Sequence, residues 1–463
     1  MNVFGDDALG QHDAVGLAAE IAARRVGVPE VVEAAIARSE ATASRLGGLA
    51  HRAYDGARAE ARAPRGGFFA GVPTWIKDNS DVAGMPTREG TDAWDAVPAR
   101  SDGDLARLHR ATGLLVLGKS QLSEFGFSAS AEHPRLGPVR NPWDPDRTAG
   151  ASSAGAAVLV ATGAVPIAHA NDGGGSIRIP ASCTGLVGLK PTRGRLAQDR
   201  SLREMPVRIV QDGVLTRTVR DTAAFYREAE RVYRDLSLPP VGDITRPSRT
   251  RLRVAVVTAG PHRTADPEVV ALTERTARTL EALGHHVEPA AAPVPDSFPD
   301  DFVTYWGFLA LASVARGRRL HGPSWDPGRL DALTLHLARH ARRRLARLPV
   351  AMARLRATAR ASARFFRGYD VVLSPTLAQP TPRLGHLDPT SDGALVLERL
   401  MDWVAFTPLH NATGDPAVSL PLATTAAGLP QGMMLGAAAG REAVLLELAY
   451  ELEEAVGWAP PPP

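Results

Sequence analysis

Apolar residues recur at helical spacing near the N-terminus and again in later parts of the chain. Between about residues 13 and 62, Leu17, Ile21, Val32 and Ile36 follow a period near 3.6, and Pro29 suits the first turn of a second helix. The same spacing predicts helices at about 266–284 and 440–456, and an Arg-rich helical region over 328–367.

The pattern changes between about residues 68 and 225 to short apolar runs separated by Gly, Pro, Ser and Asn. Runs of this kind are typical of buried strands, and they occur at 114–117, 164–168, 251–258, 371–375 and 417–421. Because these runs alternate with helical patterns, we expect a mostly parallel sheet covered by helices. The sequence contains no internal repeat or long linker, which favours one large domain.

Composition excludes several classes of protein. The 463 residues carry a formal charge of only +3, so nucleic acid is not an expected partner. The one cysteine, Cys183, excludes an intramolecular disulfide and fits a reducing compartment. The first residues do not resemble a secretory signal, and the most apolar stretch, 155–170, is too short to span a bilayer. We therefore expect a cytoplasmic protein without a membrane partner.

Lysine is rare in this chain, since Lys77, Lys119 and Lys190 are the only lysines among 53 basic residues. Arginine stays protonated at any workable pH, whereas a desolvated lysine can lose its proton and act as a base. Lys77 ends an apolar run and is followed by polar residues. It is therefore a candidate for chemistry that arginine cannot perform.

Two serines lie in small-residue segments downstream of Lys77. Ser176 follows three glycines, whose backbone can turn sharply and point several N–H groups at one spot. Ser152 precedes an apolar helix predicted over 153–162, whose N-terminal dipole favours a partly anionic oxygen. The alternative interpretation of the three glycines before Ser176 is a tight turn or a phosphate-binding loop. His169 falls in a predicted strand, where we expect a packed side chain rather than a catalytic base.

Other motifs give weaker indications. No clustered His and Cys ligands occur, so no metal is implied. Residues 113–120 match the letters of a Walker A motif, but their four central residues form a predicted strand instead of a loop, which argues against nucleotide binding. The arginines at 339–347 alternate with Leu333, Leu337, Leu345 and Leu348, as on a solvated amphipathic helix. Tyr305, Trp306 and Phe308 could line an apolar substrate site or form helix core.

Taken together, these residues resemble the amidase signature family of serine hydrolases. The motifs that carry the resemblance follow one another in the family's order: Gly71–Asp78, Gly118–Phe125, Asn141–Trp143, Gly150–Ser153, Asp172–Pro180, Gly188–Gly194 and Asn411–Gly432. The segment from 69 to 222 matches strongly, the N-terminal helices match loosely, and 225–365 carries no signature.

The resemblance implies an α/β fold with a mixed, twisted sheet covered on both faces by helices in a single domain, 1–463. Its expected parts are N-terminal helices (1–65), a catalytic core (66–225), a variable substrate region (226–367) and a C-terminal return to the sheet (368–463). Whether residues 328–367 form a lid, and whether the protein is a homodimer, is left open by the sequence.

The resemblance also assigns roles to residues. It implies a catalytic triad of Lys77, Ser152 and Ser176 and no cofactor. In the family a cis peptide precedes the bridging serine, and whether Ala151 keeps that bond before Ser152 is left open by the sequence. Substrate would contact Gly126 and the loop of Gly173, Gly174 and Gly175, whose N–H groups with that of Ser176 would form an oxyanion hole. Asp172, Arg178 and Ser153 would support the site. Ala151 and Gly173 stand where the family usually has glycine and threonine.

The expected activity is hydrolysis of a carbon–nitrogen bond in a small, apolar amide or carbamate. The motifs around Ser176 and 206–210 look most like those of enzymes acting on 6-aminohexanoate cyclic dimers, and aryl amides and urethanes are further possibilities. The alternative is the glutaminase subunit of a tRNA-dependent amidotransferase, which would need a glutamine pocket and a partner-docking surface. A P-loop nucleotide binder is a third class.

Overall fold

The N-terminal helices form where the apolar periodicity predicts them. In the computed structural model, which describes residues 1–134, 136–260 and 262–458, they are α1 (Ala14–Ala22), α2 (Val28–Leu46) and α3 (Tyr54–Ala61). Pro29 lies in the first turn of α2, and Gly47 ends that helix with φ of 75°, a conformation that suits glycine. A strand that the periodicity does not predict, β1 (Leu49–Arg52), separates α2 from α3.

The largest sheet has eight strands in the order β10-β9-β11-β13-β12-β7-β8-β6. Their bounds are β6 (Ile167–Asp172), β7 (Val187–Lys190), β8 (Gln211–Thr216), β9 (Arg253–Val256), β10 (His286–Pro289), β11 (Val371–Pro375), β12 (Ala417–Thr424) and β13 (Pro430–Ala437). Strand β9 pairs in parallel with β10 and β11, whereas the other neighbours among these described strands pair antiparallel. The sheet is therefore mixed, as the family resemblance implies.

The prediction of a mostly parallel sheet is wrong. It rested on the alternation of strands with helical patterns, which is typical of parallel crossovers. The turn of 425–429 between β12 and β13 is too short for such a crossover and joins the two strands as an antiparallel hairpin.

A smaller sheet positions the first part of the site. Strand β3 (Leu115–Ser120) lies between β1 and β2 (Pro73–Lys77), and β2 also packs against β6 of the large sheet. At this junction Thr74 Oγ1 donates a hydrogen bond to Ile167 O at 3.0 Å. The junction brings the last residues of β2 and β6 together. A separate hairpin pairs β4 (Glu132–His133) with β5 (Gly137–Pro138).

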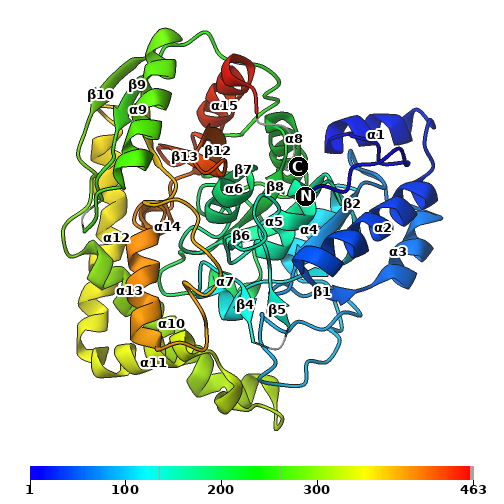
Figure 1. The fold of residues 1–463 in the computed structure, drawn as a ribbon, viewed down its shortest axis with the longest axis horizontal. Helices are drawn as coiled ribbons and strands as arrows, with labels where there is room; N and C mark the ends of the chain where they lie inside the picture. Colours follow the sequence, from blue (N-terminus) through cyan, green and yellow to red (C-terminus); the bar gives the residue numbers. More distant parts are fainter. Residues whose placement is uncertain (135, 261, 459–463) are drawn as a thin grey trace.

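Helices flank the large sheet, which confirms the predicted fold class (Figure 1). They include α5 (Ala154–Ala161), α6 (Arg178–Thr184), α8 (Val219–Val232), α9 (Pro267–Ala282) and α15 (Glu442–Val456). Two further helices are α4 (Asp104–Ala111), which packs on the small sheet, and the short α7 (Arg200–Arg203). Every residue of α5 and α6 is buried. Helix α5 consists of small and apolar residues, as expected for a helix enclosed on all sides, whereas α6 also buries Arg178.

The remaining helices gather on the side of the molecule away from α1–α3 (Figure 1). They are α10 (Phe298–His321), α11 (Ala332–Arg343), α12 (Leu348–Phe365), α13 (Gly393–Trp403) and α14 (Pro408–Thr413), with short 3-10 turns at η1 (Glu124–Gly126), η2 (Pro327–Arg329) and η3 (Leu345–Arg347). No helix in the described ranges is both long and apolar enough to cross a membrane.

The Arg-rich segment is amphipathic only in part. On α11, Leu333 and Leu337 are buried while Arg339 and Arg343 are exposed, as the spacing predicts. The prediction is wrong for Leu345, whose side chain is 47% exposed, because the turn η3 interrupts the helix there and changes the direction of the chain.

Candidate functional site

Lys77 ends β2 in a buried position between the two sheets. Its Nζ donates hydrogen bonds to Ser152 Oγ at 2.7 Å and to Asn171 Oδ1 at 2.6 Å. Burial lowers the pKa of Lys77 to about 7, against smaller opposing effects of the Asp172 and Asp212 carboxylates. The amine is therefore partly neutral near pH 7 and able to accept a proton.

His169 has a structural role beside Lys77, as predicted. Its Nδ1 accepts a hydrogen bond from the Lys77 backbone N–H at 3.1 Å, so Nε2 carries the proton toward Asp212 Oδ1 at 3.2 Å. Burial, with the nearby positive charges of Lys77 and Lys119, lowers the pKa of His169 well below its ordinary value. This pair fixes the end of β2 and leaves no free ring nitrogen for Ser176.

Ser152 and Ser153 lie at the start of α5. The peptide between Ala151 and Ser152 is cis, so Ala151 keeps the bond that the family has there. Ser153 occupies the N-cap position of α5, and its hydroxyl donates to Asn171 O at 3.3 Å instead of accepting from the first turn of the helix. Gly126 approaches from η1, where a Cβ would lie 3.1 Å from Ser152 Oγ. The Ser152 hydroxyl is therefore enclosed by Lys77 on one side and by glycine backbone on another.

Ser176 follows the glycine loop that leaves β6. Its side chain is 7% exposed and lines a cavity together with Ala151 and Gly126. Within the part of the chain that the structure describes, no hydrogen bond joins Ser176 to Ser152. The structure therefore brings the two serines and Lys77 to one place, with the Lys77–Ser152 contact formed.

The loop of Gly173, Gly174 and Gly175 offers unused donors. Neither these three backbone N–H groups nor that of Ser176 is hydrogen-bonded to another described residue. Thr407 Oγ1 donates to Gly174 O at 2.6 Å and so fixes the orientation of the peptide that carries the Gly175 N–H. Gly175 has φ of 138°, and a Cβ there would lie 2.4 Å from Thr407 Oγ1, so this position requires glycine.

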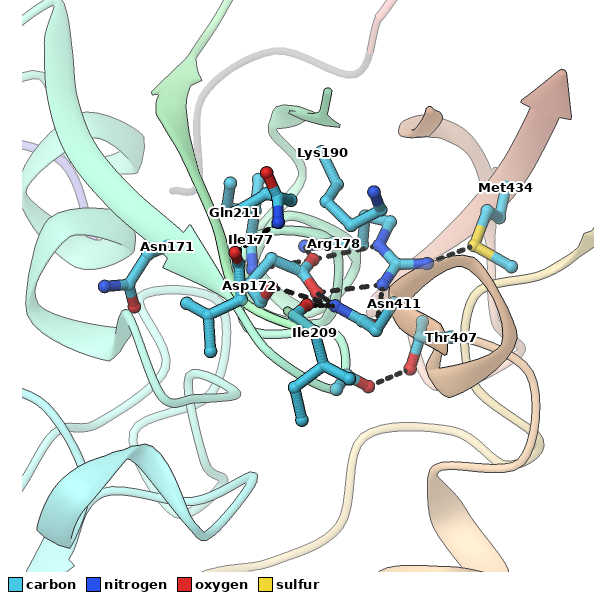
Figure 2. Close-up of polar contacts among 12 residues, drawn as sticks. Asn171, Asp172, Ile177, Arg178, Lys190, Ile209, Gln211, Thr407, Asn411 and Met434 are labelled. Carbon is cyan, nitrogen blue, oxygen red and sulfur yellow. Dashed lines mark hydrogen bonds and ion pairs between the residues drawn. The ribbon is translucent and has the colours of Figure 1, made fainter. Parts of the chain in front are cut away.

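A buried ionic network holds the loop from behind (Figure 2). Arg178 contacts Asp172 through two hydrogen bonds of 2.9 Å and donates a third to Asn411 Oδ1 at 2.7 Å. Asn411 Nδ2 in turn donates to the Asp172 side chain and backbone, each at 2.8 Å. Burial alone would raise the pKa of Asp172, but Arg178 and Asn411 hold it well below the ordinary value. The carboxylate is therefore charged and immobile.

The cavity at Ser176 is almost entirely apolar. It has an empty volume of about 500 Å³, part of it open to solvent. Its walls come from η1, α6, α10, α13 and the chain before α14, and its larger side chains are Phe127, Ile179, Phe302, Trp306, Leu397, Leu400 and Met401. No charged side chain lines it. The site therefore suits an uncharged group of substrate size.

The aromatic residues of α10 divide between the cavity and the core. Trp306 lines the cavity and stacks on Phe302 with ring centroids 5.5 Å apart. Tyr305 is fully buried and its hydroxyl donates to Val207 O at 2.7 Å. Phe308 packs in the same apolar cluster as Tyr305. Trp306 alone of the three candidates therefore faces the space beside Ser176.

The segment that resembles a Walker A motif lacks the loop of a nucleotide site. Residues 115–120 form β3, and Lys119 Nζ contacts Asp78 Oδ1 and Thr87 Oγ1, each at 3.1 Å. This arrangement agrees with the expectation that Lys119 satisfies an acidic partner at the end of a strand. Among the described residues, no group of three or more His, Cys, Asp or Glu side chains could hold a metal ion.

Three residues at the site are absent from the sequence-based set. Asn171 contacts Lys77, Thr407 contacts Gly174, and Asn411 contacts Asp172 and Arg178. Asn171 directly precedes Asp172, so its position at the end of a strand could have suggested it. Asn411 lies in a matched motif, but Thr407 precedes that motif and nothing in its surroundings indicates the contact.

Comparisons with known proteins agree with this fold. The profile of the Amidase family matches residues 30–446. Over 462 residues the chain is 62% identical to a Mycobacterium tuberculosis protein named "Putative amidase AmiC", covering 99% of this chain and 98% of that protein. The structure of 6-aminohexanoate cyclic dimer hydrolase complexed with substrate superposes with a TM-score of 0.87 at 30% identity, covering 97% and 98% of the two chains.

A second solved structure, a bacterial aryl acylamidase, gives a TM-score of 0.84 at 26% identity and covers 97% of each chain. Fold and matches together define an enzyme, a hydrolase that acts on carbon–nitrogen bonds. The chain belongs to the amidase signature family, since the family profile and the 62% identical relative each extend over most of its length.

Proposed function

We propose that this amidase hydrolyses an uncharged, apolar amide or carbamate through an acyl-enzyme on Ser176, with Ser152 and Lys77 as its proton relay. The observation that carries the proposal is the 2.7 Å hydrogen bond from Lys77 Nζ to Ser152 Oγ, formed in a fully buried setting. A lysine that burial has brought close to neutrality can act as the base that a serine nucleophile needs.

The reaction follows from these positions. Ser176 Oγ attacks the substrate carbonyl carbon while its proton passes to Ser152, whose own proton passes to Lys77. The carbon–nitrogen bond then breaks, and the amine leaves with the proton that returns from Lys77 through Ser152. Water attacks the ester in the same way, which releases the acid and restores Ser176. The relay requires that Ser176 Oγ form a hydrogen bond with Ser152 Oγ when substrate is bound.

Charge that develops on the carbonyl oxygen needs donors that are already in place. The backbone N–H groups of Gly174, Gly175 and Ser176 have no partner among the described residues, so they are available to the oxyanion. Thr407 and the network of Asp172 and Arg178 hold this loop from the other side. Fixed donors of this kind stabilise the transition state more than the substrate.

The cavity indicates the substrate class. Its walls of Phe127, Phe302, Trp306 and Met401 favour an aliphatic or aryl group on one side of the scissile bond. The related structures are described as acting on a cyclic dimer of 6-aminohexanoate and as an aryl acylamidase, both of which are consistent with such a wall. We therefore place linear, cyclic and aryl amides ahead of charged ones, with carbamates as the second group to screen.

Glutamine is a poor fit for the same cavity. Its α-carboxylate and ammonium groups would need charged partners, and a charge buried against apolar walls is costly. The lining provides none. A glutaminase subunit of an amidotransferase is therefore the less supported alternative.

The experiment is covalent trapping. A fluorophosphonate should form one adduct, and peptide mapping by mass spectrometry should place it on Ser176. Ser128→Ala is the matched control, because Ser128 lines the same cavity and should be dispensable. Ser176→Ala should lose both the adduct and turnover of an anilide. An adduct on another serine, or none in the folded protein, would exclude the proposed nucleophile.

The role of Lys77 as the base is tested by comparison with Lys119, the other buried lysine of the small sheet. Lys77→Ala should abolish labelling and turnover, whereas Lys119→Ala should label at a rate close to wild type in the folded fraction. Near-native turnover by Lys77→Ala would rule out the relay.

A further inference from the structure

A second cavity lies on the far side of the wall that encloses the Ser176 cavity. It has an empty volume of about 530 Å³, part of it open to solvent, close to the 500 Å³ of the first. It lies among the start of α10, the end of α12, β11 and α14. Its apolar walls include Phe298, Phe365, Val372, Phe406 and Leu409.

The lining combines several aromatic side chains with one imidazole, and part of the space is open to solvent. A mostly apolar pocket that holds a few polar groups is typical of a small-molecule site. Ala292, Pro293 and Val294 are among the lining residues and are half-buried.

His410 gives this cavity a polar group without a protein partner. It lines the cavity, is 4% exposed, and its Nδ1 makes no hydrogen bond with any described residue. Burial, with the charges of Arg178 and Lys190, lowers the pKa of His410 well below its ordinary value, so the ring is neutral. A buried polar atom without a partner is costly, and a bound molecule could satisfy it.

The lining also limits the charge of an occupant. It contains no Lys, Arg, Asp or Glu, and the hydroxyl of Ser362 already donates to Asp415 Oδ2 at 2.5 Å. An ion would therefore lose its hydration without gaining a countercharge. A hydroxyl group can either donate to or accept from an imidazole nitrogen, so it fits both neutral tautomers of His410.

The two cavities share one wall. Val404 and Pro408 line the first cavity, whereas Phe406 and Leu409 line the second. Thr407 lies between them and is the residue that holds Gly174 O. Met434, at the back of the second cavity, contacts Arg178 at 3.2 Å through its sulfur. An occupant would thus pack against the elements that position the glycine loop without touching Ser176.

We propose that the second cavity is a binding site, separate from the Ser176 cavity, for one uncharged ring-sized molecule that carries a hydroxyl group, such as a phenol. The ring packs among Phe365, Phe406 and Leu409, and the hydroxyl forms a hydrogen bond with His410 Nδ1. This site goes beyond the proposed amide hydrolysis and does not depend on it.

The test uses 4-fluorophenol as the probe, followed by fluorine NMR on the whole protein. Ala292→Trp should occupy part of the cavity, because Ala292 lines it, and Ala291→Trp is its matched control, because Ala291 is exposed and does not line the cavity. In the wild type and in Ala291→Trp, 4-fluorophenol should bind saturably to the second cavity. In Ala292→Trp this binding should be lost. Binding to the Ser176 cavity persists in all three proteins and is thereby distinguished.

A second probe tests the hydrogen bond. Fluorobenzene, which lacks the hydroxyl, should bind the second cavity about two- to tenfold more weakly, the net contribution of one neutral hydrogen bond. If Ala292→Trp folds poorly, Ala292→Phe repeats the test with a smaller ring. Equal binding of 4-fluorophenol to the Ala292 and Ala291 variants, or equal affinity of the two probes, would overturn the proposal.

Discussion

Lys77 Nζ and Asn171 Oδ1 lie 2.6 Å apart at the junction of the two sheets. Asn171 is held by a further hydrogen bond from its Nδ2 to Asn79 Oδ1 at 3.1 Å, which orients its carbonyl oxygen toward the lysine. An amide oxygen accepts a hydrogen bond from the amine without bringing a negative charge. The lysine is thus positioned while its pKa stays low, which a carboxylate at this place would prevent.

The first prediction concerns the pH dependence of turnover. Burial lowers the pKa of Lys77 to about 7, and only the neutral amine can accept a proton. We therefore expect kcat/KM to be low below that pKa and to rise to a plateau above it, along a limb with an apparent pKa of about 7. Measurement of kcat/KM for a neutral anilide between pH 5 and 9 reports this limb for the free enzyme.

A second buried lysine provides the control for that assignment. Burial also lowers the pKa of Lys190 to about 7, with Arg178 adding to the effect, but its Nζ donates to Pro191 O and does not contact either serine. Lys190→Met should keep the limb. A limb that disappears in this variant would assign the titration to Lys190 instead of Lys77.

The second prediction is a shift of the same limb. Asn171→Asp places a carboxylate beside the Lys77 amine, and an opposite charge favours the protonated lysine. The limb should move to higher pH by about one unit or more, so that activity at pH 7 falls and returns in alkaline buffer. Asn171→Leu, which removes the hydrogen bond without adding charge, should lower kcat without moving the limb upward. An unshifted limb in Asn171→Asp would contradict the proposed base.

The third prediction concerns Thr407, which holds the Gly174 carbonyl at 2.6 Å. Thr407→Val keeps the shape of the side chain but frees the peptide that presents the Gly175 N–H. Loss of a fixed oxyanion donor costs on the order of 10²-fold in kcat, and we expect a fall of about tenfold or more because the donor is loosened rather than removed. KM for the anilide should change little. Thr407→Ser should restore the rate, and a variant that changed only KM would indicate a role in substrate binding instead.

The three residues of the proposed relay each lie in a short motif of their own, and the structure brings these motifs together. Lys77, Ser152 and Ser176 were each indicated by local features: a rare lysine after an apolar run, and serines among small residues. Their convergence depends on the packing of β2 against β6, which no local pattern encodes. Strand 371–375 is also predicted residue for residue, since its apolar run is bounded by turn residues.

The contacts that complete the site come from distant parts of the chain. Thr407 and Asn411 lie more than two hundred residues after the glycine loop. Asn411 belongs to a family motif, but nothing in the residues around either position indicates its contact with the loop or with Asp172. Strand direction is similarly hidden, because β11 pairs with β9 and β13, which lie far from it in sequence and on opposite sides of it. The sequence thus indicates which chemistry is available, and the tertiary structure decides what supports it.

The fourth prediction concerns how much the buried Asp172–Arg178 pair contributes to the stability of the protein. Asp172→Asn would leave Arg178 buried without its countercharge, and breaking such a pair typically costs about 3–5 kcal/mol. The expected result is a large fall in the thermal unfolding midpoint. Arg25→Ala removes an exposed ion pair with Glu20, which water and salt screen, and should change the midpoint little. Similar midpoints for the two variants, measured at one scan rate, would show that the buried network contributes little to stability.

The fifth prediction concerns substrate choice. Trp306 forms a wall of the cavity close to the glycine loop, where a Cβ at Gly174 would lie 3.4 Å from its ring. Trp306→Ala should lower kcat/KM for a short apolar acyl anilide by about tenfold or more, because the acyl group loses its apolar contacts. A bulkier acyl group should lose less, since it can fill the new space. Phe308→Ala is the matched control on the same helix, because Phe308 packs away from the cavity. If Phe308→Ala changed the ratio of short to bulky substrates as much as Trp306→Ala, the proposed cavity would not be the determinant of specificity.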